Sequence, residues 1–535
     1  MESVLEFLGS LGAIGVKLSR ENDQLHCYAP QGVLNEEIKQ SIGRLRPQIM
    51  ALLPDGPAPE EARSFPLSVG QKGLYVLQQL DPDSSAYNVP LCFTSRRGIQ
   101  VRHLARAWEL LQARFPILQA RIVEEDGRLL HRLDGSGLTA LSTQAITLDA
   151  TALPAFLRER AQHPFDLRKG PLTRAELFTE SDGAATLLIT IHHIVVDGIS
   201  SVILLKQLFG YYLALCAGQT PPIPQPSDGW TEFVAWEENL LASPEGQALG
   251  AYWKNQLDGA PPSLDFPPVT GVAGGPDAGT GKLVLPLDAA LSRRIRDFSI
   301  THATPLSAIF LAAYQLLLHR YTNQDDIVVT MPVMGRAGGR FHSDVGYFVN
   351  MVPLRSRYSG AQPFQAWLEH TQRTMMDALY HSSYPLPLIV NDLKLTGANA
   401  HDVFGISYAY QNVLQLQSMT LPDGQGFDVE MVSTVSQEGS ADLGLEIFED
   451  KDLFSLHLKY AEGMLSAPMA GRMLDHLRAL LEAAVTDPAC QIQQYPLIAA
   501  AEQKRLREVF NNTGAAYDQS VCIHELFAAQ ASRAA

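Results

Sequence analysis

Residues 64–495 alternate short apolar runs with longer stretches of helical character. The almost continuously apolar run TLLITI at 186–191 is typical of a strand that is buried on both faces. Thr304 and Pro305 supply an N-cap and a first-turn proline for a helix that we expect to reach about His319, and strand 326–330 follows. The alternation predicts an α/β fold with mixed sheets. The length predicts two lobes, because one core rarely serves more than roughly 250–300 residues.

The composition is that of a folded protein, with 46% hydrophobic and 18% charged residues in 535. A formal net charge of −16 disfavours nucleic acid as a partner, since proteins that bind it usually carry a basic field. The first residues lack a basic region, so we expect no signal peptide, and no apolar run approaches the ~20 residues of a membrane helix. We therefore expect a cytoplasmic protein with no membrane partner. The cysteines are scattered and odd in number, which predicts reduced thiols and no zinc site: Cys27, Cys92, Cys216, Cys490 and Cys522.

A linker is predicted at residues 54–63, where three prolines and several charges leave little to bury. Residues 1–53 before it are expected to form a helix at 3–11, a hairpin from 16–19 and 24–28, and a second helix from Glu36 to Leu53. Asn35 is a suitable N-cap for that helix. The hairpin leaves edges that could accept a partner's strand, and the alternative is a small cap packed on the main domain.

The clearest chemical signal is the segment HHIVVDG at 192–198, where a strand delivers two adjacent histidines to a turn before a helix. Adjacent strand residues point to opposite faces, so only one histidine can face a given cavity. An imidazole can accept a proton from an amine or hydroxyl that attacks a carbonyl. Asp197 could order the turn, and Gly198 leaves room for a substrate to pass closely. No Ser, Cys or Thr forms a nucleophile set here, which favours direct transfer without a covalent enzyme intermediate.

The segment matches the H-H-x-x-x-D-G signature of the condensation domains of nonribosomal peptide synthetases, a family that the chain resembles over residues 65 to about 495. The other blocks follow in the family's order. They are SVGQKGLY at 68–75, PFDL at 164–167 with GPL at 170–172, WTEFVAW at 230–236, GYFVNMVPLR at 346–355, His381 with Pro385, and YQN at 410–412.

The resemblance implies a two-lobed, V-shaped pseudo-dimer like chloramphenicol acetyltransferase, with a tunnel between lobes at 64–240 and 241–495. It implies that an amine on a downstream carrier protein attacks the thioester of an upstream acyl or peptidyl chain. By position His193 is the catalytic histidine, acting as a base or by orienting the amine, while His192, Asp197 and Gly198 support it. Residues expected on the tunnel or substrate side are Ser200, Tyr347, Asn350 and Gln411.

One departure from the family concerns an arginine that can pair with the motif aspartate. Gln119 stands where that arginine is usual. Arg121 lies two residues on and would share the same strand face, and Arg114 is also close in sequence. We therefore expect Arg121 or Arg114 to pair with Asp197.

The first 53 residues resemble the β-hairpin docking domains that open some synthetase subunits, which implies that a short C-terminal segment of an upstream subunit binds the hairpin. The expected docking residues are Val16, Lys17, Leu18, Leu25, Cys27, Lys39 and Arg44. Residues 496–535 resemble the linker into an adenylation domain, of which only the start is present. No carrier-type attachment motif is found, so the resemblance implies no covalently bound cofactor. Phosphopantetheine arms would arrive on donor and acceptor carrier proteins.

Several related functions compete with condensation. A plant-type transferase that uses coenzyme A would carry a D-F-G-W-G block, which is not found. Epimerisation domains follow a carrier, and cyclisation domains replace the histidines by D-x-x-x-x-D. A non-catalytic condensation-like module for recruitment or gatekeeping is the alternative from another class. Known examples have degraded histidine motifs, whereas HHIVVDG is intact here.

Overall fold

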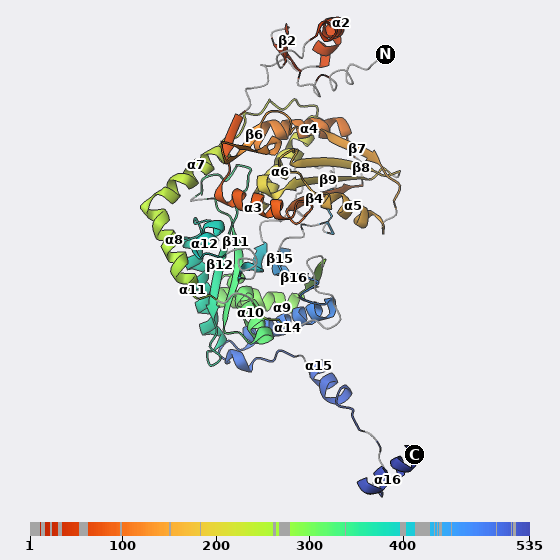
Figure 1. Ribbon diagram of the computed structural model, residues 1–535, viewed down its shortest axis with the longest axis vertical. Coiled ribbons are helices and arrows are strands. Elements are labelled where there is room, and N and C mark those ends of the chain that lie inside the picture. The colour runs from red at the N-terminus through yellow and green to blue at the C-terminus, as the bar shows by residue number, and fades with distance from the viewer. Residues whose placement is uncertain are drawn as a thin grey trace. The chain divides into compact units, whose positions relative to one another are not determined.

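The computed structural model groups the chain into two compact units (Figure 1). The first consists of Met1–Ser263, Val328–Arg355 and Met376–Asp442, and the second of Leu264–Ile327, Ser356–Met375 and Leu443–Ala535. The expected lobe boundary at 240 falls inside helix α7 (Gly229–Ala242), and the lobe boundaries stay predictions. The structure describes residues 11, 16–21, 24–29, 35–52, 63–96, 99–148, 151–181, 183–260, 264–266, 279–336, 339–395, 403–411, 429–432, 434–435, 437, 441–450, 452–498, 500–514, 516 and 520–534.

A five-stranded sheet in the order β14-β4-β9-β8-β7 organises the first unit. Its central strand β9 (Ala185–His192) runs antiparallel to β4 (Asn88–Ser95) and to β8 (Thr173–Thr179). The edge strands are β7 (Leu141–Ala145), parallel to β8, and β14 (Val429–Met431), antiparallel to β4. Every residue of β9 is buried, which confirms the strand predicted from its apolar run.

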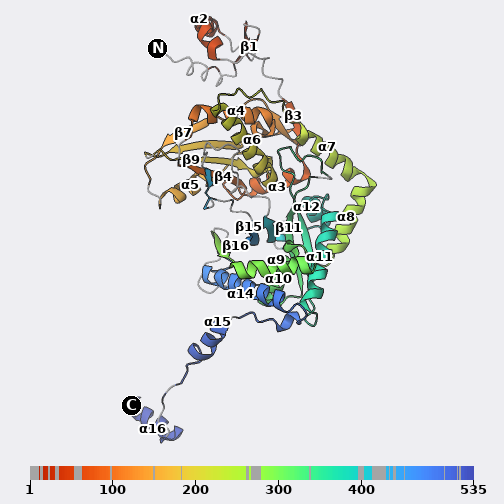
Figure 2. The ribbon, with the colours of Figure 1, turned by 180° about the vertical axis from the view of Figure 1, so that it is seen from behind.

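Helices cover both faces of this sheet, as the two figures show (Figure 2). Leu187, Ile189 and Ile191 of β9 pack in one core with α4 (Val101–Arg114) and α6 (Gly198–Cys216). Leu188 points the other way, into a core with α5 (Leu153–Gln162). Because successive strand residues alternate between faces, a strand covered on both sides has to be apolar throughout.

Smaller elements complete the first unit. Arg63, expected at the end of the linker, is instead the first residue of β3 and pairs with Leu133. The remaining elements are a three-stranded sheet of β3 (Arg63–Pro66), β6 (Arg128–Leu133) and β5 (Arg121–Glu125), with α3 (Val69–Leu80), η1 (Pro116–Gln119), η2 (His193–Val195), α7, α8 (Pro244–Leu257), α12 (Leu386–Asp392) and β13 (Ile406–Gln411). Most of β11 (Asp326–Val333) and β12 (Asn350–Arg357) also belongs to this unit, whereas residues 326–327 and 356–357 are assigned to the second.

The second unit packs helices on antiparallel strands. Its most buried helix is α10 (Leu306–Thr322), in which residues 308–318 are all buried. This helix was predicted, but it begins with Pro305 at the cap position, so Thr304 is not its N-cap. The other elements are β10 (Thr280–Pro286), α9 (Ala289–Thr301), α11 (Phe364–Tyr380), β15 (Leu443–Asp450), β16 (Leu453–Ala461), α14 (Ala467–Thr486), η5 (Ile492–Gln494), α15 (Ala500–Lys504), a π-helix (Arg505–Val509) and α16 (Ile523–Ala534).

The N-terminal segment has the predicted hairpin and following helix. Strands β1 (Lys17–Glu21) and β2 (Gln24–Tyr28) pair antiparallel, and α2 (Glu36–Leu52) follows. The Asn35 side chain accepts the Ile38 backbone N–H at 2.8 Å, which confirms the predicted N-cap. Leu11, Val16 and Ile49 form the buried centre of a separate small core. The helix predicted at 3–11 lies outside the described residues except for its last position.

Helix α6 is long and apolar enough to span a membrane by length and composition, which was not expected from the sequence. Its most apolar stretch is 44% buried. Buried core helices of soluble proteins meet the same criterion, and α6 packs on α4 and the five-stranded sheet. Its composition therefore follows from its place in the core of the first unit.

Candidate active site

The motif 192–198 joins the central strand of the first sheet to α6. Strand β9 ends at His192, the 3-10 turn η2 holds His193–Val195, and α6 begins at Gly198. The His193 backbone N–H donates to the Tyr87 carbonyl at 2.8 Å, and the Val196 N–H returns to the His193 carbonyl at 3.2 Å. The backbone of His193 is therefore held directly after the end of the buried strand β9.

The His193 ring is held in one tautomer. Its Nδ1 lies 2.7 Å from the Val196 carbonyl oxygen, and a carbonyl can only accept, so Nδ1 carries the proton. Nε2 then keeps its lone pair, and no described residue hydrogen-bonds to it. Burial lowers the pKa of His193, against the opposing effects of the Val196 carbonyl and Asp197. The edge of the ring meets Tyr347, with centroids 5.3 Å apart. The geometry leaves a neutral imidazole with one free proton acceptor.

His192 has both ring nitrogens engaged. Nδ1 accepts the Ile194 backbone N–H at 3.1 Å, so Nε2 carries the proton and donates to Gln78 Oε1 at 3.2 Å. Burial lowers the pKa of His192 to about 3, with a smaller effect from His193. The ring is buried and meets Phe165 edge-on. His192 is thus a neutral residue of the core with both ring nitrogens hydrogen-bonded, and its supporting role stays a prediction.

The Asp197 carboxylate ties three segments together. Oδ1 accepts the Ser200 backbone N–H at 2.7 Å, which caps the N-terminus of α6. Oδ2 accepts the Phe348 backbone N–H at 3.1 Å. Arg336 Nη2 donates to Oδ1 at 3.0 Å, and both side chains are almost completely buried. Such a pair is sustained only when its remaining hydrogen-bonding groups are also largely satisfied.

Arg336 largely meets that requirement through both of its terminal nitrogens, while its buried Nε has no hydrogen-bond partner among the described residues. Nη2 donates to Ser200 Oγ at 2.8 Å, and Nη1 donates to the carbonyls of Phe341 and Asp344. The guanidinium lies over the Phe348 ring, 4.2 Å from its centroid. The network therefore anchors segment 341–348, which carries Tyr347, to the turn that carries His193.

Comparison with known proteins shows the family to which the chain belongs. The family model described as "Condensation domain" matches residues 61–507, and the "TubC N-terminal docking domain" matches residues 4–55. The chain belongs to the condensation domain family. Among curated relatives, polyketide synthase PksN of Bacillus subtilis is 35% identical over 480 residues, which are 88% of this chain and 9% of PksN. One of the linear gramicidin synthase proteins of Brevibacillus parabrevis is 29% identical and covers 90% of this chain. The chain spans 6% of that synthase protein.

Solved structures show the same fold. A four-domain nonribosomal peptide synthetase bound to AMP and glycine matches with a TM-score of 0.73 at 19% identity, over 83% of this chain and 35% of that one. The first condensation domain of the calcium-dependent antibiotic synthetase, in complex with a substrate analogue, matches with 0.68 at 21%, over 82% and 99%. The X-domain from teicoplanin biosynthesis matches with 0.70 at 21%, over 83% and 99%. The expected α/β condensation fold with an N-terminal docking domain is thereby confirmed.

The arginine expectation for this condensation domain is wrong. Arg121 on β5 pairs with Asp134 at 2.7 Å, and Arg114 donates to the Gln225 carbonyl. Gln119 donates to the Gln112 carbonyl at 2.8 Å, so it does not replace a partner of Asp197. The prediction relied on closeness to Gln119 in sequence, whereas the partner of Asp197 is Arg336, which lies 139 residues from it and reaches it only in the folded chain.

Two glycines mark the missed arginine segment. Gly335 has φ +62°, and an added Cβ would lie 1.7 Å from the Phe348 carbonyl oxygen. At Gly346 an added Cβ would lie 2.2 Å from the Trp230 ring. Both positions require backbone to approach other groups closely. In the sequence, the available signal for this segment was a glycine, Gly335, directly before Arg336.

The residues expected on the substrate side differ in their surroundings. Ser200 is fully buried and its Oγ bonds to Gly346 and Arg336, so the expectation that it faces substrate is wrong. Asn350 uses its amide to hold residues 382–386, donating to the Ser382 and Tyr384 carbonyls and accepting the Leu386 N–H. Tyr347 does lie against His193. Gln411 ends β13, and Asn412 lies outside the described residues.

The expected docking residues differ in how far they are buried. Leu18 and Leu25 are half-buried against the small core, with Val16 in its centre. Cys27 is exposed and lies opposite Leu18 in the hairpin. Lys39 and Arg44 are exposed on α2, while nothing is described for the Lys17 side chain. Their role in docking stays a prediction.

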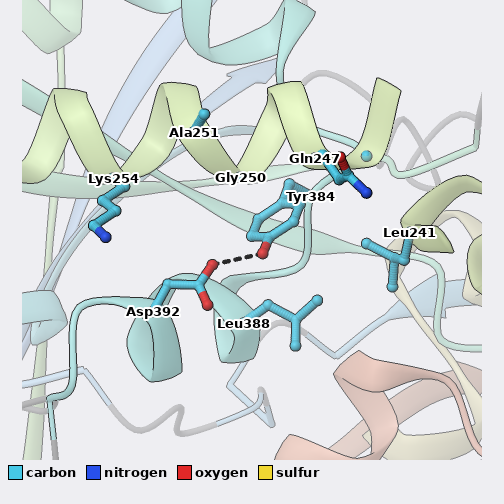
Figure 3. A pocket seen from close by; sticks show the side chains of 9 residues that line it. Leu241, Gln247, Gly250, Ala251, Lys254, Tyr384, Leu388 and Asp392 are labelled. Atoms are coloured by element: carbon cyan, nitrogen blue, oxygen red, sulfur yellow. Dashed lines mark hydrogen bonds between the residues drawn. The ribbon is translucent and has the colours of Figure 1, made fainter. Parts of the chain in front are cut away.

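A hollow of about 390 Å³ lies between α8 and α12 (Figure 3). Tyr384 donates to Asp392 at 2.6 Å within it, and an added Cβ on Gly250 would lie 2.9 Å from the Tyr384 oxygen. None of its lining residues belongs to the His193 turn or contacts that ring. The residues that line it are Leu241, Gly246, Gln247, Gly250, Ala251, Lys254, Tyr384, Leu388 and Asp392.

Proposed function

We propose that this condensation domain joins two carrier-bound substrates through an amide bond, with His193 as the catalytic residue. The observation that carries the proposal is the tautomer of His193: Nδ1–H is committed to Val196, which leaves the Nε2 lone pair free. His192, in contrast, has both ring nitrogens engaged in hydrogen bonds within the fold. The likeness of fold alone does not carry the proposal, since the teicoplanin X-domain shares it.

The proposed step needs no covalent enzyme intermediate. The amine of the downstream aminoacyl group forms a C–N bond to the thioester carbonyl carbon, and the C–S bond breaks. His193 Nε2 orients the amine, accepts its proton as the bond forms, and passes it to the leaving thiolate, which becomes the free carrier thiol. A pKa lowered by burial suits this relay, because the imidazole is neutral at the start and its conjugate acid releases the proton readily.

Space for the substrates exists beside the turn. Gly198 is exposed, and an added Cβ there would meet no atom within 4 Å. We propose that the phosphopantetheine arm of a partner carrier passes this glycine to present its thioester to His193. The arms are substrates delivered by donor and acceptor carriers, and the chain itself holds none covalently.

The N-terminal hairpin is proposed to recruit the upstream subunit through a short C-terminal segment that adds to a hairpin edge. We further propose an adenylation domain downstream in the complete protein and a cytoplasmic location. The curated relatives include a polyketide synthase and a peptide synthase, so the upstream chain is a peptide or a polyketide.

The test is single-turnover reconstitution followed by intact-protein mass spectrometry. Cognate upstream and downstream carriers are loaded with donor acyl and acceptor aminoacyl groups and mixed with the protein. The proposal predicts the condensed product on the downstream carrier and a free thiol on the upstream one. Binding of both carriers without any transfer would overturn it in favour of a recruitment or gatekeeping module.

A further inference from the structure

Helix α3 presents two buried glutamines toward the turn that carries His193. Gln71 and Gln78 are seven residues apart, which is two helical turns, so they lie on the same face. Both are at most 2% exposed. Buried amides have to be hydrogen-bonded, and the partners that these two use define what they hold in place.

Gln71 holds the Ile194 carbonyl. Its Oε1 accepts the Ser68 backbone N–H at 3.1 Å, and since a backbone N–H can only donate, this contact fixes which amide atom is the oxygen. His131 Nε2 lies 3.0 Å from the same oxygen and therefore donates to it. The amide nitrogen is left to donate to the Ile194 carbonyl, at 2.6 Å. Gln71 is thus oriented by two donors behind it and delivers one bond to the turn.

Gln78 holds the other side of Ile194 through His192. Its Nε2 lies 3.1–3.3 Å from the carbonyls of Asp81, Pro82 and Ser84, so its Oε1 is free to accept from His192 Nε2. His192 Nδ1 in turn accepts the Ile194 N–H. Both backbone polar groups of the residue after His193 are therefore clamped from one helix.

The clamp acts on the bond that sets the His193 tautomer. The Ile194 N–H and C=O belong to the two peptide groups that follow His193, and the Val196 carbonyl that receives Nδ1–H lies at the end of the same short turn. If the Ile194 carbonyl were released, these peptide groups could rotate and displace the Val196 oxygen. Nδ1 would then lose its acceptor, and Nε2 would no longer be the favoured site of the lone pair.

We propose that Gln71 is a positioning residue for His193, acting through the Ile194 carbonyl to hold the imidazole in its Nδ1–H tautomer. This inference deepens the proposed function and rests on it for its kinetic consequence. The structural part, the tautomer, stands apart from any activity.

The test compares Gln71→Met, which keeps the length of the side chain and removes its hydrogen bonds, with Gln112→Met. Gln112 is a matched control: it is also buried, and its amide holds Thr139 through a donor and an acceptor bond. We expect Gln71→Met to lower the single-turnover rate by about 10- to 100-fold at saturating carriers, with half-saturating carrier concentrations unchanged. Gln112→Met should keep the rate within about twofold. In ¹⁵N-histidine spectra, the His193 signals, assigned by their loss in His193→Ala, should show the Nδ1–H form weakened only in Gln71→Met.

A second variant guards against a folding defect. In Gln71→Glu the protonated carboxyl can still donate to the Ile194 carbonyl, so this variant should recover part of the rate at pH 6 relative to Gln71→Met. Equal rates for Gln71→Met and Gln112→Met, an unchanged His193 tautomer, or no recovery by Gln71→Glu would each overturn the inference. If wild type forms no amide at all, the proposed function fails, and the spectra alone still decide the positioning role.

Discussion

The Asp197 carboxylate and the Arg336 guanidinium form the most heavily bonded polar contact beside His193, and nearly all of it is removed from solvent. Removing one partner of a buried pair leaves an uncompensated charge. The two arginines near Gln119, in contrast, have partners of their own, since Arg121 pairs with Asp134 at a partly exposed site and Arg114 donates to the Gln225 carbonyl. Substitutions of these arginines should therefore lower the free energy of unfolding by very different amounts.

Arg336→Met should destabilise the protein by about 3 to 5 kcal/mol, because Asp197 would remain buried without its counter-charge. Arg121→Met should cost about 1 kcal/mol or less, since the Arg121–Asp134 pair is only partly buried. Urea denaturation of both variants measures the difference. Equal losses would mean that the Asp197–Arg336 pair does not support the turn.

Glu237, which bonds to the start of α3, should make the stability of the protein depend on pH. Its carboxylate accepts the Val69 N–H at 2.8 Å, and burial raises its pKa to about 7. A raised pKa means that the folded state binds the proton more tightly, so this stability is present below pH ~4.5 and is lost as the pH rises to 7. Glu237→Gln keeps an acceptor without the charge. It should therefore be more stable than wild type at pH 8, by up to about 3 kcal/mol, and by less than about 1 kcal/mol at pH 5.

Thermal denaturation at the two pH values checks this prediction. Glu159→Gln, which changes an exposed residue of α5, is the control and should shift the melting temperature little at either pH. A Glu237→Gln variant that is no more stable than wild type at pH 8 would show that Glu237 is well accommodated as a carboxylate.

At the scale of elements, two glycines near the strand–turn–helix unit of β9, η2 and α6 have different surroundings. Gly346 is in close contact with another residue, whereas Gly198 has open space beside it. Gly346 lies against Trp230, whereas an added Cβ on Gly198 would meet no atom of a more distant residue within 4 Å. The same substitution should therefore act on folding at one position and on substrate access at the other.

Gly346→Ala should destabilise the protein by about 1 to 3 kcal/mol, because the new methyl group would overlap the Trp230 ring. Gly198→Ala should leave stability unchanged or slightly higher, since Gly198 is the first residue of α6. If a carrier arm passes Gly198, that variant should still lower the rate of transfer. Melting temperatures and single-turnover rates of the two variants, measured together, separate these effects; a full rate in Gly198→Ala would place the arm elsewhere.

Local chemistry determined what the sequence could predict about these elements. The Asn35 cap, the hairpin, strand β9 and the separation of the two histidines all follow from periodicity and capping within a few residues. The Asp197–Arg336 pair spans 139 residues and the Gln71–Ile194 bond spans 123. Such pairs depend on which segments the fold brings together. The sequence therefore placed Gln71 in a family motif without indicating its role, and it did not identify Arg336 as the partner of Asp197.

At the scale of the whole molecule, the N-terminal segment has its own core around Leu11, Val16 and Ile49. Arg63 is the first residue of β3 and pairs with Leu133 of the first unit. A deletion of residues 1–62 should therefore leave the rest folded, with unchanged turnover when carriers are supplied at saturating concentration. Affinity for the C-terminal segment of the upstream subunit should be lost. Titration calorimetry with that segment tests this, and unchanged affinity in the deletion variant would contradict a docking role.

The central claim is that His193, through its free Nε2, carries amide formation. The most direct measurement is the single-turnover rate constant of His193→Ala relative to wild type, with cognate loaded carriers at saturation. We predict a loss of about 100-fold or more, with carrier affinity and melting temperature unchanged, because a positioned acid–base group contributes about 10²- to 10⁴-fold. A rate within about threefold of wild type would contradict the claim and assign the chemistry to other groups.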